Sequence, residues 1–379
     1  MRLLPWRRRR VVVPALPADD LLVTEENLRH AVEGVLAVRE RQIRGGVIVF
    51  RGDLQVDRAR ALDELLRRLA PFGYTPFLKA DGDTVVVQAW PLGDMTQPTR
   101  PLLALVLFGL TVLSTFAAGY AFFTGSETFD AMRQLPFPVS LLSGAPFALT
   151  LLTILGVHEF GHYFTARHYG AAVSLPYFIP APMLFGTFGA IIRMRSPARD
   201  RNSLFDIAAA GPLAGLMVAL PALVLGLTWS RVVTTPAGAG FGGFGYSLLT
   251  RLFVYLRFGT LEPSASIVTH PMADAAWVGC FVTALNLVPV GQLDGGRIAY
   301  ALSARRHRLV GVASWVVLLA LGAVTGSANW FVWAALLFFM VGFDHSPPLD
   351  DLTPLTPARR WLALACLVLV ILLLPPIPI

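Results

Sequence analysis

The sequence is poor in charge and in cysteine. Only 15% of its 379 residues are charged, whereas 55% are hydrophobic and the mean hydropathy is +0.61. These values lie outside the usual range of soluble domains, so we interpret the chain as a membrane protein that crosses the bilayer several times. The two cysteines, Cys280 and Cys366, both lie in apolar runs. This placement argues against a disulfide framework and against a cysteine-bound metal.

Acidic residues are scarcer than basic ones, and the formal net charge is +7. A basic excess can indicate a nucleic-acid partner. Here, however, the arginines are spread over loops beside apolar runs, where the positive-inside rule accounts for them. We therefore predict no nucleic-acid binding. Because most of these arginines fall in loops on the same side as the N-terminus, the rule also predicts a cytoplasmic N-terminus.

One polar motif interrupts the apolar run 146–169. His158, Glu159 and His162 form an H-E-x-x-H pattern. Residues four apart share a helix face, so both imidazoles can bind one metal ion while Glu159 acts on a water molecule beside it. The match alone can also be a structural accident. An acidic residue at the centre of a membrane helix costs about 2.5–3.5 kcal/mol, and residues at that cost usually serve a function.

A third ligand is needed for a catalytic zinc site, and Asp294 is the candidate. It ends the long apolar run that starts at Ala275, and no other acidic residue lies between Asp274 and Asp344. Taken alone, Asp294 is equally well interpreted as a loop residue that begins a turn before two glycines. Two histidines and one aspartate, with a fourth position open, are typical of a catalytic site and not of a closed structural one.

These motifs resemble the site-2 protease family of intramembrane zinc metalloproteases. The resemblance rests on HEFGH at 158–162, N-x-x-P-x-x-x-L-D-G at 286–295, GTFGAIIRM at 186–194 and FDIAAAGPLAG at 205–215, and it covers about residues 101–348. The loop 231–270 lies where some members insert a PDZ domain. It is too short for one, so the chain is similar to the subgroup without PDZ, which includes cyanobacterial and chloroplast members with an N-terminal soluble domain.

The resemblance implies an enzyme, a zinc-dependent endopeptidase that holds one Zn²⁺ per chain. Its expected activity is hydrolysis of peptide bonds within or near transmembrane segments, with release of cytoplasmic fragments. Its expected partners are the lipid bilayer and single-span membrane proteins, and its expected location is a bacterial inner or plasma membrane. Asn286, in a motif shared with the family, is our candidate for a second catalytic residue that stabilises the oxyanion. An asparagine between spans can equally make a packing hydrogen bond.

The stretch 174–194 is apolar but contains too many prolines and glycines for a helix. One interpretation is a surface loop. We favour a re-entrant hairpin beside the metal, because irregular backbone at membrane depth needs shielding by protein or water. Residues Gly186, Thr187, Phe188, Gly189 and Ala190 would then form a substrate-binding edge that pairs with an unwound substrate strand.

The sequence predicts a mainly α protein, a membrane helix bundle of six to seven spans with a small N-terminal α/β soluble domain. The predicted parts are a basic arm (1–20), the α/β domain (21–97), the protease core (98–348) and a C-terminal linker with a last span (349–379). The expected spans are about 101–123, 146–169, 205–229, 273–302, 309–326, 329–343 and 361–374.

The α/β domain shows no catalytic constellation, and we interpret it as a regulatory or substrate-recruiting module. Its pattern predicts an α-β-α-β-β order: a helix capped by Thr24 whose apolar face reaches Leu36, a strand at 47–50, a turn at 51–53, a helix at 56–69 and a hairpin of 76–79 with 84–89.

Two other functions compete with proteolysis. A catalytically silent membrane scaffold or chaperone would keep the fold, although it would be free to lose Glu159. A metal transporter would also use buried histidines and acids. It would be expected to distribute them along several spans, whereas the polar residues here gather at one depth.

Overall fold

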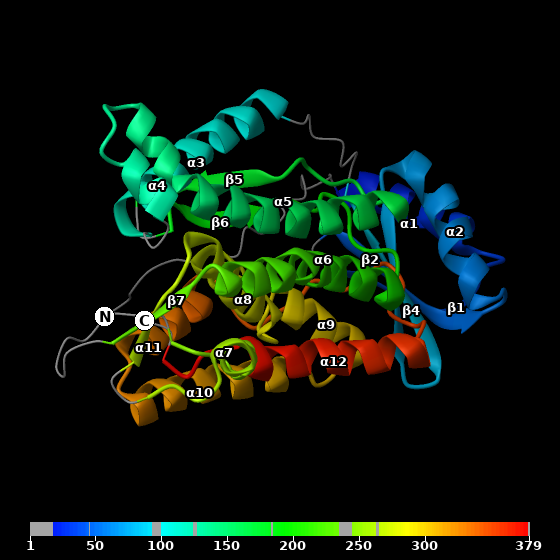
Figure 1. Cartoon of the computed structure of the whole chain (residues 1–379). Coiled ribbons are helices and arrows are strands. Elements are labelled where there is room, and N and C mark those ends of the chain that lie inside the picture. The colour runs from blue at the N-terminus through cyan, green and yellow to red at the C-terminus, as the bar shows by residue number, and fades with distance from the viewer. Residues whose placement is uncertain are drawn as a thin grey trace, which may run out of the picture. The chain divides into compact units, whose positions relative to one another are not determined.

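The computed structural model describes residues 18–44, 46–92, 100–123, 127–182, 185–234, 245–262 and 265–377. Most of the predicted basic arm and of the linker before residue 100 lies outside these ranges. The chain forms two compact units (Figure 1). The first, here called the N-terminal unit, comprises residues 1–97, 195–201 and 346–354; the remainder is the membrane unit.

The N-terminal unit is an antiparallel sheet with two helices. Its strands lie in the order β1-β2-β4-β3, and Phe50, Leu65 and Leu69 are among the fully buried core residues. Its elements are α1 (Ala18–Val32), β1 (Leu36–Arg44), β2 (Val47–Leu54), α2 (Arg58–Leu69), a 3₁₀ turn (Ala70–Phe72), β3 (Thr75–Asp81) and β4 (Thr84–Trp90).

Strand β1 was not predicted, and the predicted turn at 51–53 is wrong. The chain leaves α1 at Gly34, which has φ +81°, and residues 51–53 continue β2 opposite β1. A Cβ atom at Gly52 would lie 1.9 Å from the Ala37 carbonyl oxygen. The glycine therefore permits a close approach of two strands where the sequence suggested a turn.

The membrane unit is mainly helical. Its helices are α3 (Pro101–Phe122), α4 (Glu127–Met132), α5 (Ala145–His168, after a 3₁₀ turn at Val139–Gly144), α6 (Arg201–Thr228), α7 (Leu248–Phe258), α8 (Pro271–Leu287), α9 (Asp294–Leu302), α10 (His307–Thr325), α11 (Ala328–Leu336, followed by a π turn at Leu337–Val341) and α12 (Pro357–Leu373). Two short antiparallel strand pairs accompany them, the hairpin of β5 (Tyr177–Pro180) with β6 (Thr187–Ile191) and the pair of β7 (Arg231–Thr234) with β8 (Ala265–Val268).

Among the described residues, four helical segments are long and apolar enough to cross a membrane: Pro101–Phe122, Val139–His168, Arg201–Thr228 and His307–Thr325. Six to seven spans are thus not confirmed. One reason is that the apolar run 273–302 is not a single helix. It breaks after α8 at residues 288–293, where Pro289 and Gly291, with φ +49°, interrupt the helical backbone. This break places Asp294 at the start of α9.

Candidate metal centre

Helix α5 carries the H-E-x-x-H motif in the interior of the membrane unit. His158, Glu159 and His162 are all buried, with exposed fractions of 3%, 5% and 4%. The two imidazole rings lie on one face with centroids 4.9 Å apart, as the four-residue spacing predicts. Both Nε2 atoms point to the same place, 3.1 Å from each other.

Asp294 completes the group from the first turn of α9. Its Oδ2 atom lies 3.1 Å from Nε2 of His162 and 3.6 Å from Nε2 of His158. One donor atom from each of the three residues falls within 4.8 Å of the others, and this is the one such metal-type cluster within the described ranges. The fold thus brings together the three residues that the sequence nominated.

The donor set suits zinc. Tetrahedral ligands about 2.0–2.1 Å from Zn²⁺ lie roughly 3.3 Å from one another, close to the separations of the three donor atoms. Imidazole nitrogens and a carboxylate oxygen are ligands that zinc prefers, and a set of three leaves a fourth position open. The residues present therefore fit a catalytic zinc ion.

Helix α6 holds His162 in place, which sequence reasoning did not foresee. Nδ1 of His162 donates to the carbonyl oxygen of Ile207 at 2.6 Å, and this bond leaves Nε2 free of its proton for a metal. Gly211, one turn further along α6, lies against the ring: a Cβ atom there would be 2.1 Å from Nε2 of His162. The sequence AAAG at 208–211 indicates a helix face of small residues, but it does not indicate that the His162 ring packs against that face.

Three further groups surround the motif. Asn286, near the end of α8, places Nδ2 3.5 Å from Nε2 of His158. The guanidinium of Arg297 and the main chain of Ile192 both interact electrostatically with the Glu159 carboxylate. Asn286 was expected near the site, whereas Arg297 and Ile192 were not. Arg297 follows Asp294 by one helical turn, so its proximity could have been inferred from the helix period.

The predicted substrate-binding residues 186–190 form part of the β5–β6 hairpin. Within the described ranges β6 pairs with β5 alone, so its other edge is open. Phe188 is 67% exposed. Gly186 has φ +73°, and its carbonyl oxygen accepts a 2.6 Å hydrogen bond from Ser114 of α3. The hydrogen bond from Ser114 therefore joins the hairpin to α3, and the edge of β6 that faces away from β5 is left without a paired strand in the described part of the chain.

Three other histidines of the membrane unit do not join the metal cluster. His270 caps α8, since its Nδ1 accepts from the Met272 amide at 3.2 Å. His345 packs its ring 4.8 Å from that of Tyr300. His168 ends α5 beside Tyr169. All three contacts are structural.

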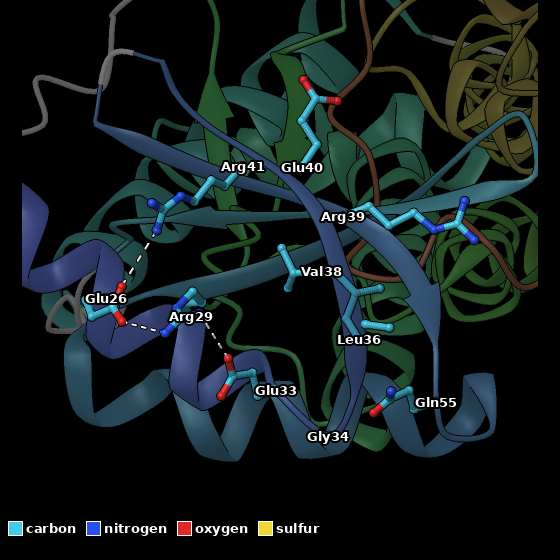
Figure 2. A pocket seen from close by; sticks show the side chains of 11 residues that line it. Glu26, Arg29, Glu33, Gly34, Leu36, Val38, Arg39, Glu40, Arg41 and Gln55 are labelled. Carbon is cyan, nitrogen blue, oxygen red and sulfur yellow. Dashed lines mark hydrogen bonds and ion pairs between the residues drawn. The ribbon is translucent and has the colours of Figure 1, made fainter.

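The N-terminal unit has a polar groove of about 510 Å³ between α1 and β1 (Figure 2). Arginine and glutamate side chains alternate around it and pair with one another, as Glu26 does with Arg29 at 2.6 Å and with Arg41 at 3.7 Å. Hydrogen bonding to Arg29 lowers the pKa of the Glu26 carboxyl. The groove holds neither a metal-type cluster nor a nucleophile–base pair among its described lining residues.

Comparison with known proteins agrees with this geometry. Residues 146–325, a little under half of the chain, match peptidase family M50. The chain is 31% identical over 350 residues to a probable chloroplastic zinc metalloprotease, EGY2, of Arabidopsis thaliana, covering 88% of this chain and 60% of that protein. It is 32% identical over 298 residues to EGY1 of the same plant, described in the same terms, covering 73% of this chain and 53% of that protein.

A rice protein, the probable zinc metalloprotease EGY3, is 29% identical over 297 residues, covering 72% of this chain and 49% of that protein. The chain thus spans about three fifths of the length of the two EGY2 relatives that it matches, from Arabidopsis thaliana and rice. No solved structure matches it. The matched region contains both the H-E-x-x-H helix and Asp294, so the chain carries a peptidase M50 domain over residues 146–325 and is homologous to the EGY zinc metalloproteases.

Proposed function

We propose that the protein is a zinc metalloprotease that hydrolyses peptide bonds within or near the transmembrane segments of membrane proteins. The observation that carries this proposal is the meeting of His158, His162 and Asp294 inside an apolar helical unit, with Glu159 beside them. Two relatives described as probable zinc metalloproteases support it. A catalytically silent scaffold remains the competing function.

In this proposal His158, His162 and Asp294 are the zinc ligands. Bound zinc supplies a Lewis acid that polarises the scissile carbonyl and makes water a nucleophile at neutral pH. The protein sets the geometry of the ligands. The Ile207 carbonyl fixes the ring orientation of His162, and the burial of both histidines, with Asp294 partly buried, limits the access of bulk water to the site.

Glu159 is the general acid–base. Its carboxylate takes the proton of the attacking water and delivers it to the leaving nitrogen, so that the amide bond breaks to an acid and an amine. Asn286 is the proposed donor to the oxyanion, because its amide lies at the ligand cluster on the side of His158.

The open edge of β6 is the proposed substrate-binding surface. A helical substrate segment has its peptide groups hydrogen-bonded and covered, so it must unwind before cleavage. An unwound strand that pairs with residues 186–190 recovers those hydrogen bonds. We propose single-span membrane proteins as substrates, because a single span can leave its neighbours and enter the site without disturbing a larger bundle.

The four long apolar helices support an integral membrane protein. The relatives are named as chloroplastic, so they do not support the expected bacterial plasma membrane, and we drop that expectation. We propose that residues 98–348 form the catalytic core and that the N-terminus lies on the side of the membrane that carries the arginine-rich loops.

Cleavage of a single-span reporter by the purified full chain tests the proposal. The zinc-loaded protein in detergent is compared with Glu159→Gln and with Glu33→Gln, which changes an exposed glutamate of the N-terminal unit. We expect cleavage by wild type and Glu33→Gln, and a loss of about 10²–10⁴-fold in Glu159→Gln. Equal cleavage by Glu159→Gln would refute the role of Glu159. A wild type that binds the reporter without cutting it would favour the scaffold.

A further inference from the structure

The N-terminal unit contains two segments from distant parts of the sequence, 195–201 and 346–354. The second of these extends the sheet. The Leu78 amide of β3 donates to the Leu349 carbonyl oxygen at 2.7 Å, and the Asp351 amide donates to the Leu78 carbonyl oxygen at 3.0 Å. The outer edge of β3 is thereby covered by residues 349–351, and Leu349 joins the core of the unit.

The first segment pairs with the second. The Leu349 amide donates to the Ala198 carbonyl oxygen at 2.9 Å, and the Asp350 amide donates to the Arg199 carbonyl oxygen at 2.8 Å. Asp350 thus forms bridges to Leu78 on one side and to Asp200 on the other. Main-chain hydrogen bonds therefore run without a break from the N-terminal sheet to residues 198–200.

Two ion pairs fasten the same segment. Arg201 Nε lies 2.7 Å from Oδ1 of Asp351, whose side chain is only 5% exposed. Arg199 pairs with Asp63 of α2 at 2.6 Å, with both side chains well exposed. Arg201 is the first residue of α6, where a positive charge opposes the helix dipole. Its position there is explained by the buried partner Asp351.

Segment 195–201 is continuous in the chain with the catalytic elements on both sides. Before it lies β6 with its open edge, followed by residues 193–194. These two residues pair with residues 173–174, where the Ser174 amide donates to the Arg193 carbonyl oxygen at 3.0 Å. The last residue of the segment, Arg201, begins α6, and the Ile207 carbonyl that orients His162 lies six residues further along that helix. The open edge of β6 and the Ile207 carbonyl, which accepts from the proposed ligand His162, are thus both connected through the chain to segment 195–201.

We propose that the N-terminal unit positions the active site by fixing residues 195–201, and that Asp351 and Arg201 are the principal positioning residues. This inference rests on the proposed proteolytic function for its biological meaning. Loosening the hold of the N-terminal unit on 195–201 frees β6 and the first turns of α6 together.

Hydrogen exchange of the full-length zinc-loaded protein in detergent, followed by mass spectrometry, tests the proposal without a substrate. Asp351→Asn is compared with wild type and with Asp53→Asn, which breaks the ion pair to Arg39 at the opposite edge of the same sheet. We expect Asp351→Asn to speed exchange at least tenfold in residues 187–194 and 202–207. Zinc loss to a chelator should also be at least tenfold faster. Asp53→Asn should leave both unchanged.

If Asp351→Asn does not fold, Asp63→Asn removes the exposed pair to Arg199 and should produce the same pattern at a smaller amplitude, about threefold. Faster exchange confined to 346–354, with 187–207 and zinc loss as in wild type, would overturn the proposal. Reporter cleavage is measured in parallel. A wild type that cuts no reporter would count against the proposed function, while the exchange pattern would still decide whether the N-terminal unit positions the site.

Discussion

Gly211 is the most sensitive position next to the metal ligands, and Gly211→Ala tests the geometry of the site. The added Cβ would lie 2.1 Å from Nε2, 2.4 Å from Cδ2 and 2.5 Å from Cε1 of His162. Ordinary contacts between heavy atoms begin at about 3.5 Å. The imidazole and helix α6 must therefore separate by roughly 1.4 Å.

A metal ligand tolerates displacement of only about 0.2 Å, so His162 leaves the coordination sphere in this variant. Changes to the groups that hydrogen-bond to metal ligands already cost about 10–100-fold in metal affinity. We expect Gly211→Ala to weaken zinc binding by at least about 100-fold, and overpacking to cost about 1–3 kcal/mol of folding free energy. Elemental analysis and chelator competition measure the first effect, and thermal unfolding in detergent measures the second.

Two glycines provide matched controls. At Gly215 a Cβ would lie 3.3 Å from Cβ of His158, a tight contact that small shifts can relieve. At Gly156 of α5 nothing lies within 4 Å. We expect Gly215→Ala to lose no more than about tenfold in zinc affinity, and Gly156→Ala to bind zinc normally with a gain of about 0.5–1 kcal/mol in stability. Wild-type zinc affinity in Gly211→Ala would refute the packing of α6 against His162.

Three further variants test other contacts. Asp206 of α6 accepts two hydrogen bonds from Arg359 of α12 at 2.8 and 2.7 Å, so Asp206→Asn should lower stability by about 1.5–3 kcal/mol in thermal unfolding. Ser114→Ala removes the hydrogen bond to the Gly186 carbonyl; KM for the reporter should rise severalfold while zinc content stays constant. The hydroxyl of Tyr74 is buried without a hydrogen-bond partner in the described part of the chain, so Tyr74→Phe should stabilise the protein by about 1 kcal/mol. Burial raises the pKa of Tyr74, so the unfolded chain ionises first, and the stability that wild type loses above about pH 10 should persist in the variant.

The ligand cluster could be predicted because its signals are local. A spacing of four places His158 and His162 on one helix face, and an isolated acid at the end of an apolar run singled out Asp294. The break before Asp294 also had visible signals in Pro289 and Gly291, but the continuous apolar composition of 273–302 outweighed them. Hydropathy alone therefore overestimated the length of that helix.

Other features could not be predicted because main-chain groups supply them. The carbonyl of Ile207 orients His162, yet every residue has a carbonyl, so no residue type marks it. The pairing of Leu78 with residues 349–351 joins segments about 270 positions apart through backbone amides. Strand β1 was missed for a related reason. Its charged, weakly alternating sequence forms a strand only because β2 offers an edge at Gly52.

The central claim is that one zinc ion is shared by α5 and α9. Elemental analysis of the protein purified without chelator tests it in wild type, in Asp294→Ala and in Asp344→Ala, which removes an acid whose side chain is 69% exposed. We predict about one zinc per chain in wild type and Asp344→Ala and a sharp reduction in Asp294→Ala. Wild type without zinc, or Asp294→Ala with a full zinc complement, would contradict the account.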